Sequence, residues 1–187
     1  GNFLVTSYYT NGTIVYDITY PDKMVEVAYY DSYLGSGWGF YGCWGTFPYL
    51  PSGNIISSDV NSASNGGGKL LIYSREFQQA CHLDGIITDQ NSGNFINNAN
   101  ISVLNTNFSS NSNLNGFYQT ATLDSGLYQV VFSAFGYEND TASIFLNNGT
   151  VANLNMSLEP TCNFPKPDSL YLFDIIDTRA KLGWKNM

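Results

Sequence analysis

The sequence predicts an all-β protein, and three features of its composition lead to that prediction. Aromatic residues make up 16% of the chain, and these residue types are enriched in strands. Charged residues make up only 12%, well below the roughly 25% that is typical of soluble domains. No stretch has the apolar spacing of a long amphipathic helix. Short strands separated by uncharged turns rich in Gly, Asn and Ser are therefore expected throughout.

Two similar hairpins are expected in residues 1–80. Each has an apolar strand, a glycine-containing turn and a second strand that ends near a tyrosine. Further strands are expected between the hairpins, at Met24–Tyr30 and Trp44–Leu50. A repeat of about fifty residues with four strands per unit is typical of propeller blades, so residues 1–80 are interpreted as the C-terminal part of a β-propeller. The strands of the two hairpins are expected at 2–7, 13–17, 54–58 and 70–74.

A family resemblance supports the propeller interpretation. It rests on the run NFLVTSYYTNGTIVYDITYPDKMVEVAYYDS and, most specifically, on Gly42–Asp59 with its Trp-Gly, Phe-Pro and Leu-Pro-Ser-Gly-Asn elements. Both segments resemble the last blades of the choice-of-anchor B family, secreted Bacteroidota proteins with LVIVD-type repeats. The loop NSASNGGG is longer than the family pattern. The resemblance implies an extracellular or outer cell-surface location and export by the type 9 secretion system.

Residues 81–160 are predicted to form a separate β-sandwich. Short alternating segments recur here, and turns such as Asp124-Ser125-Gly126 and Asn147-Asn148-Gly149 separate them. Regular short strands of this kind indicate two packed antiparallel sheets. The main strands are expected at Phe117–Leu123, Leu127–Ala134, Ser143–Leu146 and Val151–Leu158.

This second unit resembles the carboxypeptidase regulatory-like domain, which implies a transthyretin-like sandwich. The chain departs from the family pattern at Phe95-Ile96-Asn97-Asn98, where the family usually has a proline-containing turn. The resemblance is carried by five motifs, at Gly85–Asp89, Ala99–Val103, Asn115–Tyr118, Ser125–Tyr128 and Ser133–Tyr137.

Residues 161–187 begin with a stiff Pro-containing linker. The remaining residues resemble the first two strands of a fibronectin type III domain, with Trp184 at the position of that fold's buried tryptophan. Both ends of the chain look cut, so we expect an internal piece of a larger protein. The free sheet edges of such a piece are expected to be covered by the missing propeller blades or by a partner chain.

Charge and motif content exclude several classes of function. A formal net charge of −8 disfavours binding to a phosphate backbone, so no nucleic acid partner is expected. No run of 18 apolar residues is present, so no membrane span is expected. No hydrolase, zinc-protease or phosphate-loop motif occurs.

No catalytic residue is predicted, so the chain is not expected to be an enzyme. The single histidine, His82, has Asp84 two residues away and no candidate nucleophile beside it. The acids Asp17, Asp22, Asp31 and Asp59 leave a glycosidase-like pair open, although Asp17 and Asp59 also suit turn capping at strand ends.

No cofactor is predicted. The cysteines show no metal-binding spacing. Calcium at Asp89-Gln90-Asn91 is a candidate that a plain Asx turn explains equally well.

The segment Gly35–Gly53 raises the question of ligand binding, because aromatic and glycine residues alternate densely in it. Trp38, Phe40 and Tyr41 lie in the Gly-rich loop and are the candidate ligand-binding residues, since exposed rings can stack on sugars. Trp44, Phe47 and Pro48 fall in an expected blade strand and are interpreted as core.

Two covalent features are also expected. Cys81 and Cys162 bracket the second unit and can form a disulfide if its first and last strands are neighbours, which leaves Cys43 as a buried thiol. Thr141 and Ser169 follow aspartates in the short motif that Bacteroidota glycosylate, and they are candidate O-glycosylation sites.

The favoured function is non-enzymatic: adhesion, scaffolding, or binding of glycans or cell-surface proteins outside the cell, as cargo of the secretion machinery. One alternative is an accessory region of a secreted peptidase whose catalytic domain lies upstream. A second alternative is a subunit of a surface filament, which would assemble through the free sheet edges.

Overall fold

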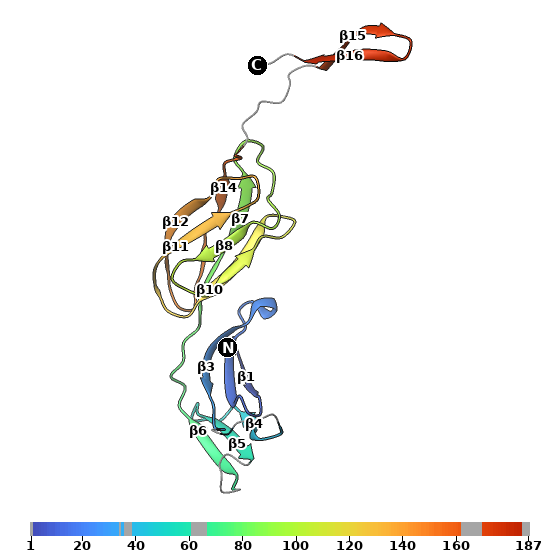
Figure 1. The fold of residues 1–187 in the computed structure, drawn as a ribbon. Helices are drawn as coiled ribbons and strands as arrows, with labels where there is room; N and C mark the ends of the chain where they lie inside the picture. The colour runs from blue at the N-terminus through green and yellow to red at the C-terminus, as the bar shows by residue number, and fades with distance from the viewer. Residues whose placement is uncertain (1, 34, 36–38, 61–66, 162–169, 185–187) are drawn as a thin grey trace.

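The computed structural model describes residues 2–33, 35, 39–60, 67–161 and 170–184, and strands dominate this part of the chain (Figure 1). The one helical element there is a short 3-10 turn at Pro21–Lys23. The all-β prediction is therefore confirmed for the described residues.

Two three-stranded antiparallel sheets make up the N-terminal region. Every strand expected there is present, and both predicted hairpins form, as β1 with β2 and β5 with β6. The grouping differs from the expected four strands per unit, because β4 pairs with β5 and not with β3. The propeller interpretation itself stays a prediction. The strands are β1 (Phe3–Ser7), β2 (Thr13–Asp17), β3 (Val25–Tyr30), β4 (Gly42–Phe47), β5 (Ile55–Val60) and β6 (Lys69–Tyr73).

The two sheets join along β1 and β4. The backbones of Tyr9 and Cys43 exchange two hydrogen bonds, with N···O distances of 3.1 and 2.9 Å. Behind this bridge the hydroxyls of Thr13 and Ser57 share a hydrogen bond of 2.6 Å. This contact fixes β2 against β5, and a groove between β3 and β6 opens on the opposite side.

The turn between β1 and β2 depends on glycine. Gly12 has a φ of +78°, and a Cβ there would lie 1.9 Å from the carbonyl oxygen of Tyr30. Only glycine lets β3 approach this turn so closely. The turn at Asn11-Gly12 therefore also positions the third strand.

Residues 81–158 form a β-sandwich, as predicted. One sheet has the order β10-β7-β13, with β14 also on β7, and the other has the order β12-β11-β8-β9. Its strands are β7 (Cys81–Asp89), β8 (Asn100–Val103), β9 (Ser109–Asn111), β10 (Phe117–Thr122), β11 (Gly126–Ser133), β12 (Asp140–Leu146), β13 (Val151–Asn153) and β14 (Met156–Leu158). Fully buried side chains from both sheets fill the core, among them Leu83, Ile87, Ile101, Tyr118, Val130, Phe132, Leu146 and Leu158.

The strand expected at Val151–Leu158 is divided into β13 and β14, which both run parallel to β7. Between them Leu154 turns toward β7. Its amide donates to Asp84 O (2.8 Å), and its carbonyl accepts from the hydroxyl of Tyr118 (2.6 Å). These two hydrogen bonds of Leu154 lie at the point where the expected strand divides.

The C-terminal residues form a hairpin of β15 (Leu170–Ile176) and β16 (Arg179–Trp184). The two strands pair antiparallel, and Leu170 lies opposite Trp184. Both strands expected after the linker are thus present. Their assignment to a fibronectin type III domain stays a prediction.

The proposed disulfide reaches outside the described residues. Cys81 and Cys43 are both buried thiols, and burial raises the pKa of Cys81. Cys81 is the first residue of β7. Leu158, the last residue of β14, pairs with Asp89 at the opposite end of β7. Cys162 lies outside the described residues, and its pairing with Cys81, which would require the chain to return along β7, stays a prediction.

Candidate functional site

An exposed aromatic cluster lies where the two N-terminal sheets join. Tyr9 makes edge-to-face contacts with Phe40 and with Trp44, at centroid distances of 5.2 and 5.9 Å. The exposed fractions are 74% for Phe40, 58% for Trp44 and 40% for Tyr9. Tyr41 is also exposed, and its ring stacks on Tyr33. We call Tyr9, Phe40, Tyr41 and Trp44 the aromatic surface.

A β-bulge lies at Trp44, whose side chain points outward. The register between β4 and β5 shifts between Cys43 and Gly45, so Trp44 has no partner in β5. Cys43 points inward, where it is 1% exposed and lies 3.3 Å from the Thr13 hydroxyl. Because successive side chains of a strand point to opposite faces, Trp44 lies on the outer face next to the inward Cys43.

The backbone of Tyr9 has an unusual conformation. Its φ is +45°, which is the left-handed region that L-residues with large side chains rarely occupy. The bridge to Cys43 and the tight turn to Gly12 hold it there. Strained residues tend to gather at functional sites, so this conformation supports the aromatic surface as a candidate site.

The structure agrees only in part with the residues proposed from the sequence. Phe40 and Tyr41 are exposed, as a contact role requires, and whether they bind a ligand stays a prediction. Trp38 lies outside the described residues. The interpretation of Trp44 and Phe47 as core is wrong, because they are 58% and 48% exposed. The glycine after Trp44 could have signalled the bulge, since isolated glycines in strands often mark one.

The described residues include one of the two candidate O-glycosylation sites. Thr141 is exposed on β12, so it is accessible for modification, and its glycosylation stays a prediction. Ser169 lies outside the described residues.

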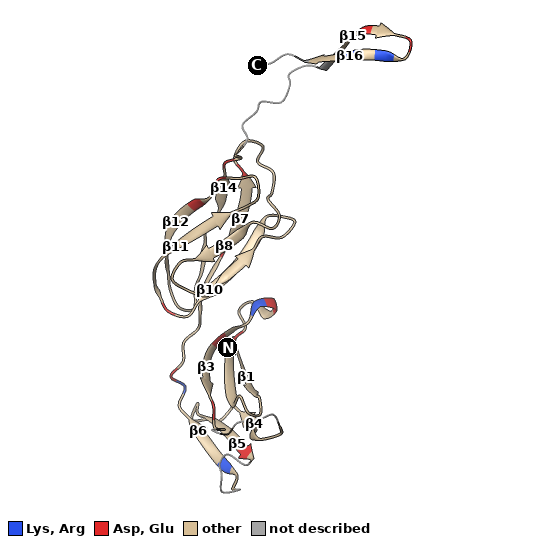
Figure 2. Cartoon of the chain, viewed as in Figure 1, with Lys and Arg blue, Asp and Glu red and all other residues tan. Residues whose placement is uncertain are grey.

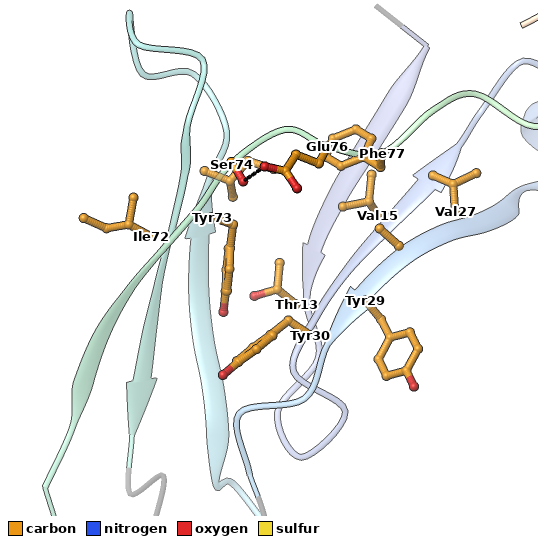
Figure 3. A pocket seen from close by; sticks show the side chains of 12 residues that line it. Thr13, Val15, Val27, Tyr29, Tyr30, Ile72, Tyr73, Ser74, Glu76 and Phe77 are labelled. Atoms are coloured by element: carbon orange, nitrogen blue, oxygen red, sulfur yellow. Dashed lines mark hydrogen bonds between the residues drawn. The ribbon is translucent and has the colours of Figure 1, made fainter.

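A groove of about 480 Å³ lies between β3 and β6, on the side of the sheets away from the β1–β4 join (Figure 3). The rings of Tyr30 and Tyr73 stand 5.2 Å apart at its centre. Glu76 lies above them, and its Oε1 accepts a hydrogen bond from Ser74 (3.0 Å). The Tyr73 hydroxyl is buried, and burial raises its pKa, although the neighbouring hydroxyls of Thr13 and Ser57 act in the opposite direction.

Asp17 and His82 form a buried polar contact between the N-terminal sheets and the sandwich. Asp17 is fully buried and His82 is 1% exposed. Asp17 Oδ2 lies 3.2 Å from His82 Nε2 and accepts the Ala80 amide at 2.9 Å. Asp17 Oδ1 accepts both the amide and the hydroxyl of Thr19, at 2.8 and 2.7 Å. Burial alone would raise the pKa of Asp17, but these hydrogen bonds together hold it below its ordinary value of 3.8.

Further contacts surround this pair. The Tyr20 hydroxyl donates to Asp84 Oδ2 (2.8 Å), and burial together with this bond raises the pKa of Tyr20 to about 12. Lys23 donates to Ser110 and to Gln119 O. Val25 packs with Ala80 and Ala121 from the sandwich side. Sequence reasoning placed His82 beside Asp84, but Asp17, which is 65 positions away, is its partner.

Asp89 and Asp59 lie in different surroundings. Asp89 accepts the amides of Asn91 and Ser92, which is the expected Asx turn. Asp59 is 2% exposed, and neither of its carboxylate oxygens forms a hydrogen bond. Within the described residues no group of three or more His, Cys, Asp or Glu side chains is placed to hold a metal ion. No helix in that part of the chain is long and apolar enough to cross a membrane.

The second unit is a small β-sandwich built on one long central strand, β7. Residues 82–159 match the family model of the carboxypeptidase regulatory-like domain, so a domain of this family is present in the chain. The motifs from Gly85 to Tyr137 had indicated the same family. Comparison with curated proteins gives no match.

Two crystal structures from streptococcal pili are similar to this chain over a limited part. The first is GBS52, the minor pilin of Streptococcus agalactiae, at 12% identity and a TM-score of 0.37, with 66% of each chain covered. The second is the group B streptococcus pilus 2b backbone protein, at 12% identity and a TM-score of 0.37, with 60% of this chain and 51% of that chain covered. The match thus spans less than two thirds of either pilus protein, and at this level of similarity it carries no argument about function.

Proposed function

We propose that this chain is part of a non-enzymatic extracellular or cell-surface protein that binds neutral glycans through the aromatic surface. The observation that carries the proposal is the exposed cluster of Tyr9, Phe40 and Trp44. Contiguous exposed apolar side chains often mark an interaction site, because covering them removes apolar surface from water. A sugar ring offers an apolar face that stacks on such rings and a polar rim that stays hydrated.

Charge narrows the class of glycan. The formal net charge is −8, and Figure 2 shows that acidic and basic residues are both sparse along the ribbon. A negative field repels sulfated or uronic-acid glycans, whereas neutral sugars are unaffected. The aromatic surface contains no charged side chain, so neutral glycans fit it best.

The location and export belong to the same proposal. The likeness of Gly42–Asp59 to the choice-of-anchor B family supports a Bacteroidota surface protein exported by the type 9 secretion system. In this proposal residues 1–80 are the C-terminal part of a propeller, and the carboxypeptidase regulatory-like sandwich is a scaffold that follows it. In this proposal the chain acts in both scaffolding and adhesion by binding a surface glycan.

Replacing Phe40 or Trp44 with alanine is expected to lower neutral-glycan affinity about tenfold, since an aromatic contact contributes roughly 1 kcal/mol or more. The measurement is a neutral-glycan array followed by calorimetric titration of the strongest hit. Phe135→Ala is the matched control, because Phe135 is a fully exposed ring on the sandwich. An array without neutral-glycan hits, or full affinity in both variants, would refute the proposal.

A second candidate function is an accessory region of a secreted peptidase. The match of residues 82–159 to the carboxypeptidase regulatory-like domain favours it. The catalytic residues would then belong to another part of a longer protein. Peptidase activity in the full-length product that is unchanged by Trp44→Ala, together with no glycan binding, would favour this candidate over the first.

A further inference from the structure

The groove between β3 and β6 differs from the aromatic surface in its chemistry. Tyr30 and Tyr73 form its centre, Phe77 lies at one end, and the carboxylate of Glu76 stands over it (Figure 3). The residues that line it include no lysine or arginine. Arg75 is the nearest basic residue in sequence, and its guanidinium lies over the ring of Phe77, 5.7 Å from the centroid. The groove itself is therefore aromatic and acidic.

The hollow continues toward the sandwich. A second hollow of about 340 Å³ shares Val27, Glu76 and Phe77 with the groove. The sandwich adds Asp124 to its wall, and its lining also lacks basic residues. We call these two adjacent hollows together the channel, and two carboxylates, Glu76 and Asp124, line it.

A free backbone edge borders this channel. Four consecutive residues of β3, Val27 to Tyr30, line the groove. Successive side chains of a regular strand point to opposite faces, so four consecutive lining residues indicate that the edge of β3, which has a bulge at Val27, faces the groove. Within the described residues β3 pairs with β2 alone. Unpaired amides and carbonyls of such an edge can bind another extended chain.

We propose that this channel binds an extended segment of a partner protein, which pairs with the edge of β3 and places a lysine or arginine side chain between Tyr30, Tyr73 and Glu76. Aromatic faces and a carboxylate both attract a cation, and they attract it more strongly where water is partly excluded. The chain's net negative charge steers a basic segment toward it. The segment also supplies the missing strand neighbour of β3.

The test uses two short peptides on the 187-residue chain. One is acetyl-Thr-Lys-Thr-Lys-Thr-Lys-amide, and the other has glutamate in place of lysine. The lysine peptide is expected to bind saturably, to shift the ring signals of Tyr30 and Tyr73 in NMR spectra, and to slow amide exchange in β3. The glutamate peptide is expected to do none of these.

Two matched variants separate the site from general charge attraction. Glu76→Gln removes the carboxylate above the groove, and we expect it to weaken the lysine peptide about fivefold or more. Glu26→Gln removes the same charge from β3 at a residue that does not line the groove, and we expect affinity within about twofold of the parent chain. Equal losses in the two variants would mean non-specific attraction and would overturn the proposal.

Other results would also overturn it. Binding without protection of β3 amides would place the peptide elsewhere. Protection of β3 that rises with protein concentration and no peptide would mean that a second copy of the chain occupies the edge. Because none of these residues belongs to the aromatic surface, a failure here leaves the glycan proposal standing, and glycan binding should be unchanged in Glu76→Gln.

Discussion

Replacing Gly85 with alanine is expected to lower the free energy of unfolding of the sandwich by about 3 kcal/mol, at the upper end of overpacking effects. A Cβ on this residue would lie 2.0 Å from the carbonyl oxygen of Leu154 and 2.9 Å from a ring carbon of Tyr118. The first contact is with backbone, so a change of rotamer cannot relieve it. Either β7 or the segment between β13 and β14 has to move.

That movement would break contacts which define the centre of the sandwich. The Leu154 carbonyl accepts the Tyr118 hydroxyl at 2.6 Å, and its amide donates to Asp84 O at 2.8 Å. Tyr118 is 1% exposed, so a hydroxyl that loses this partner is left buried and unpaired. The expected cost therefore combines steric strain with at least one lost hydrogen bond.

Urea unfolding followed by circular dichroism measures this effect. Gly126→Ala is the control, because a Cβ there meets only Tyr128, at 3.7 Å, which is an ordinary contact. The control should unfold within about 0.5 kcal/mol of the parent chain. If both variants unfold at the same urea concentration, the close approach of Leu154 to β7 is wrong.

Replacing Asp17 with alanine is expected to lower stability by about 3 kcal/mol and to loosen the junction between the N-terminal sheets and the sandwich. The change removes the acceptor for two Thr19 groups, the Ala80 amide and His82 Nε2. Ala80 and His82 are fully buried or nearly so, and water does not replace the lost partner. Buried donors without acceptors account for most of the expected cost.

Chemical unfolding and amide exchange at Ala80 report the two parts of this prediction. Asp22→Ala, at an exposed residue of the 3-10 turn, is the control and should change neither quantity. Faster exchange at Ala80 and faster proteolysis in the residues before β7 are expected only for Asp17→Ala. Unchanged exchange at Ala80 would show that the junction does not depend on this carboxylate.

The same residue makes the junction sensitive to acid. The folded-state pKa of Asp17 lies below its ordinary value of 3.8, because hydrogen bonds to the carboxylate outweigh the opposing effect of burial. Its stabilising contribution is therefore complete above about pH 4 and is lost as the pH falls through the lower folded value. The stability difference between the parent chain and Asp17→Asn should shrink below pH 4. A difference that stays constant from pH 7 to pH 3 would contradict this assignment.

Several parts of the fold were predictable because they depend on neighbouring residues. Apolar segments on either side of glycine-containing turns located β1, β2, β5 and β6, and Asn11-Gly12 lies in the turn of the first hairpin. The Asx turn at Asp89 was predictable for the same reason, since its acceptor and donors lie within three residues. In the sandwich, five short motifs were enough to indicate the family that residues 82–159 match.

Other features depended on residues that are far apart in the sequence. The pairing of β4 with β5, and not with β3, decided how the sheets divide and where the groove lies. Packing of β4 against β2 decided which face of β4 is buried: Cys43 contacts Thr13, which is 30 positions away. Trp44, the next residue along the strand, therefore lies on the exposed face and not in the expected core.

The strands, the turns and the β-sandwich follow from local patterns in the sequence, since the two-residue period and the turn residues act over a few positions. Which side chains meet depends instead on how the sheets pack. Asp17 reaches His82 across 65 positions, and Tyr30 reaches Tyr73 across the space between two sheets. Such contacts depend on how separate sheets pack, and a local pattern of residues carries no information about the distance between sheets.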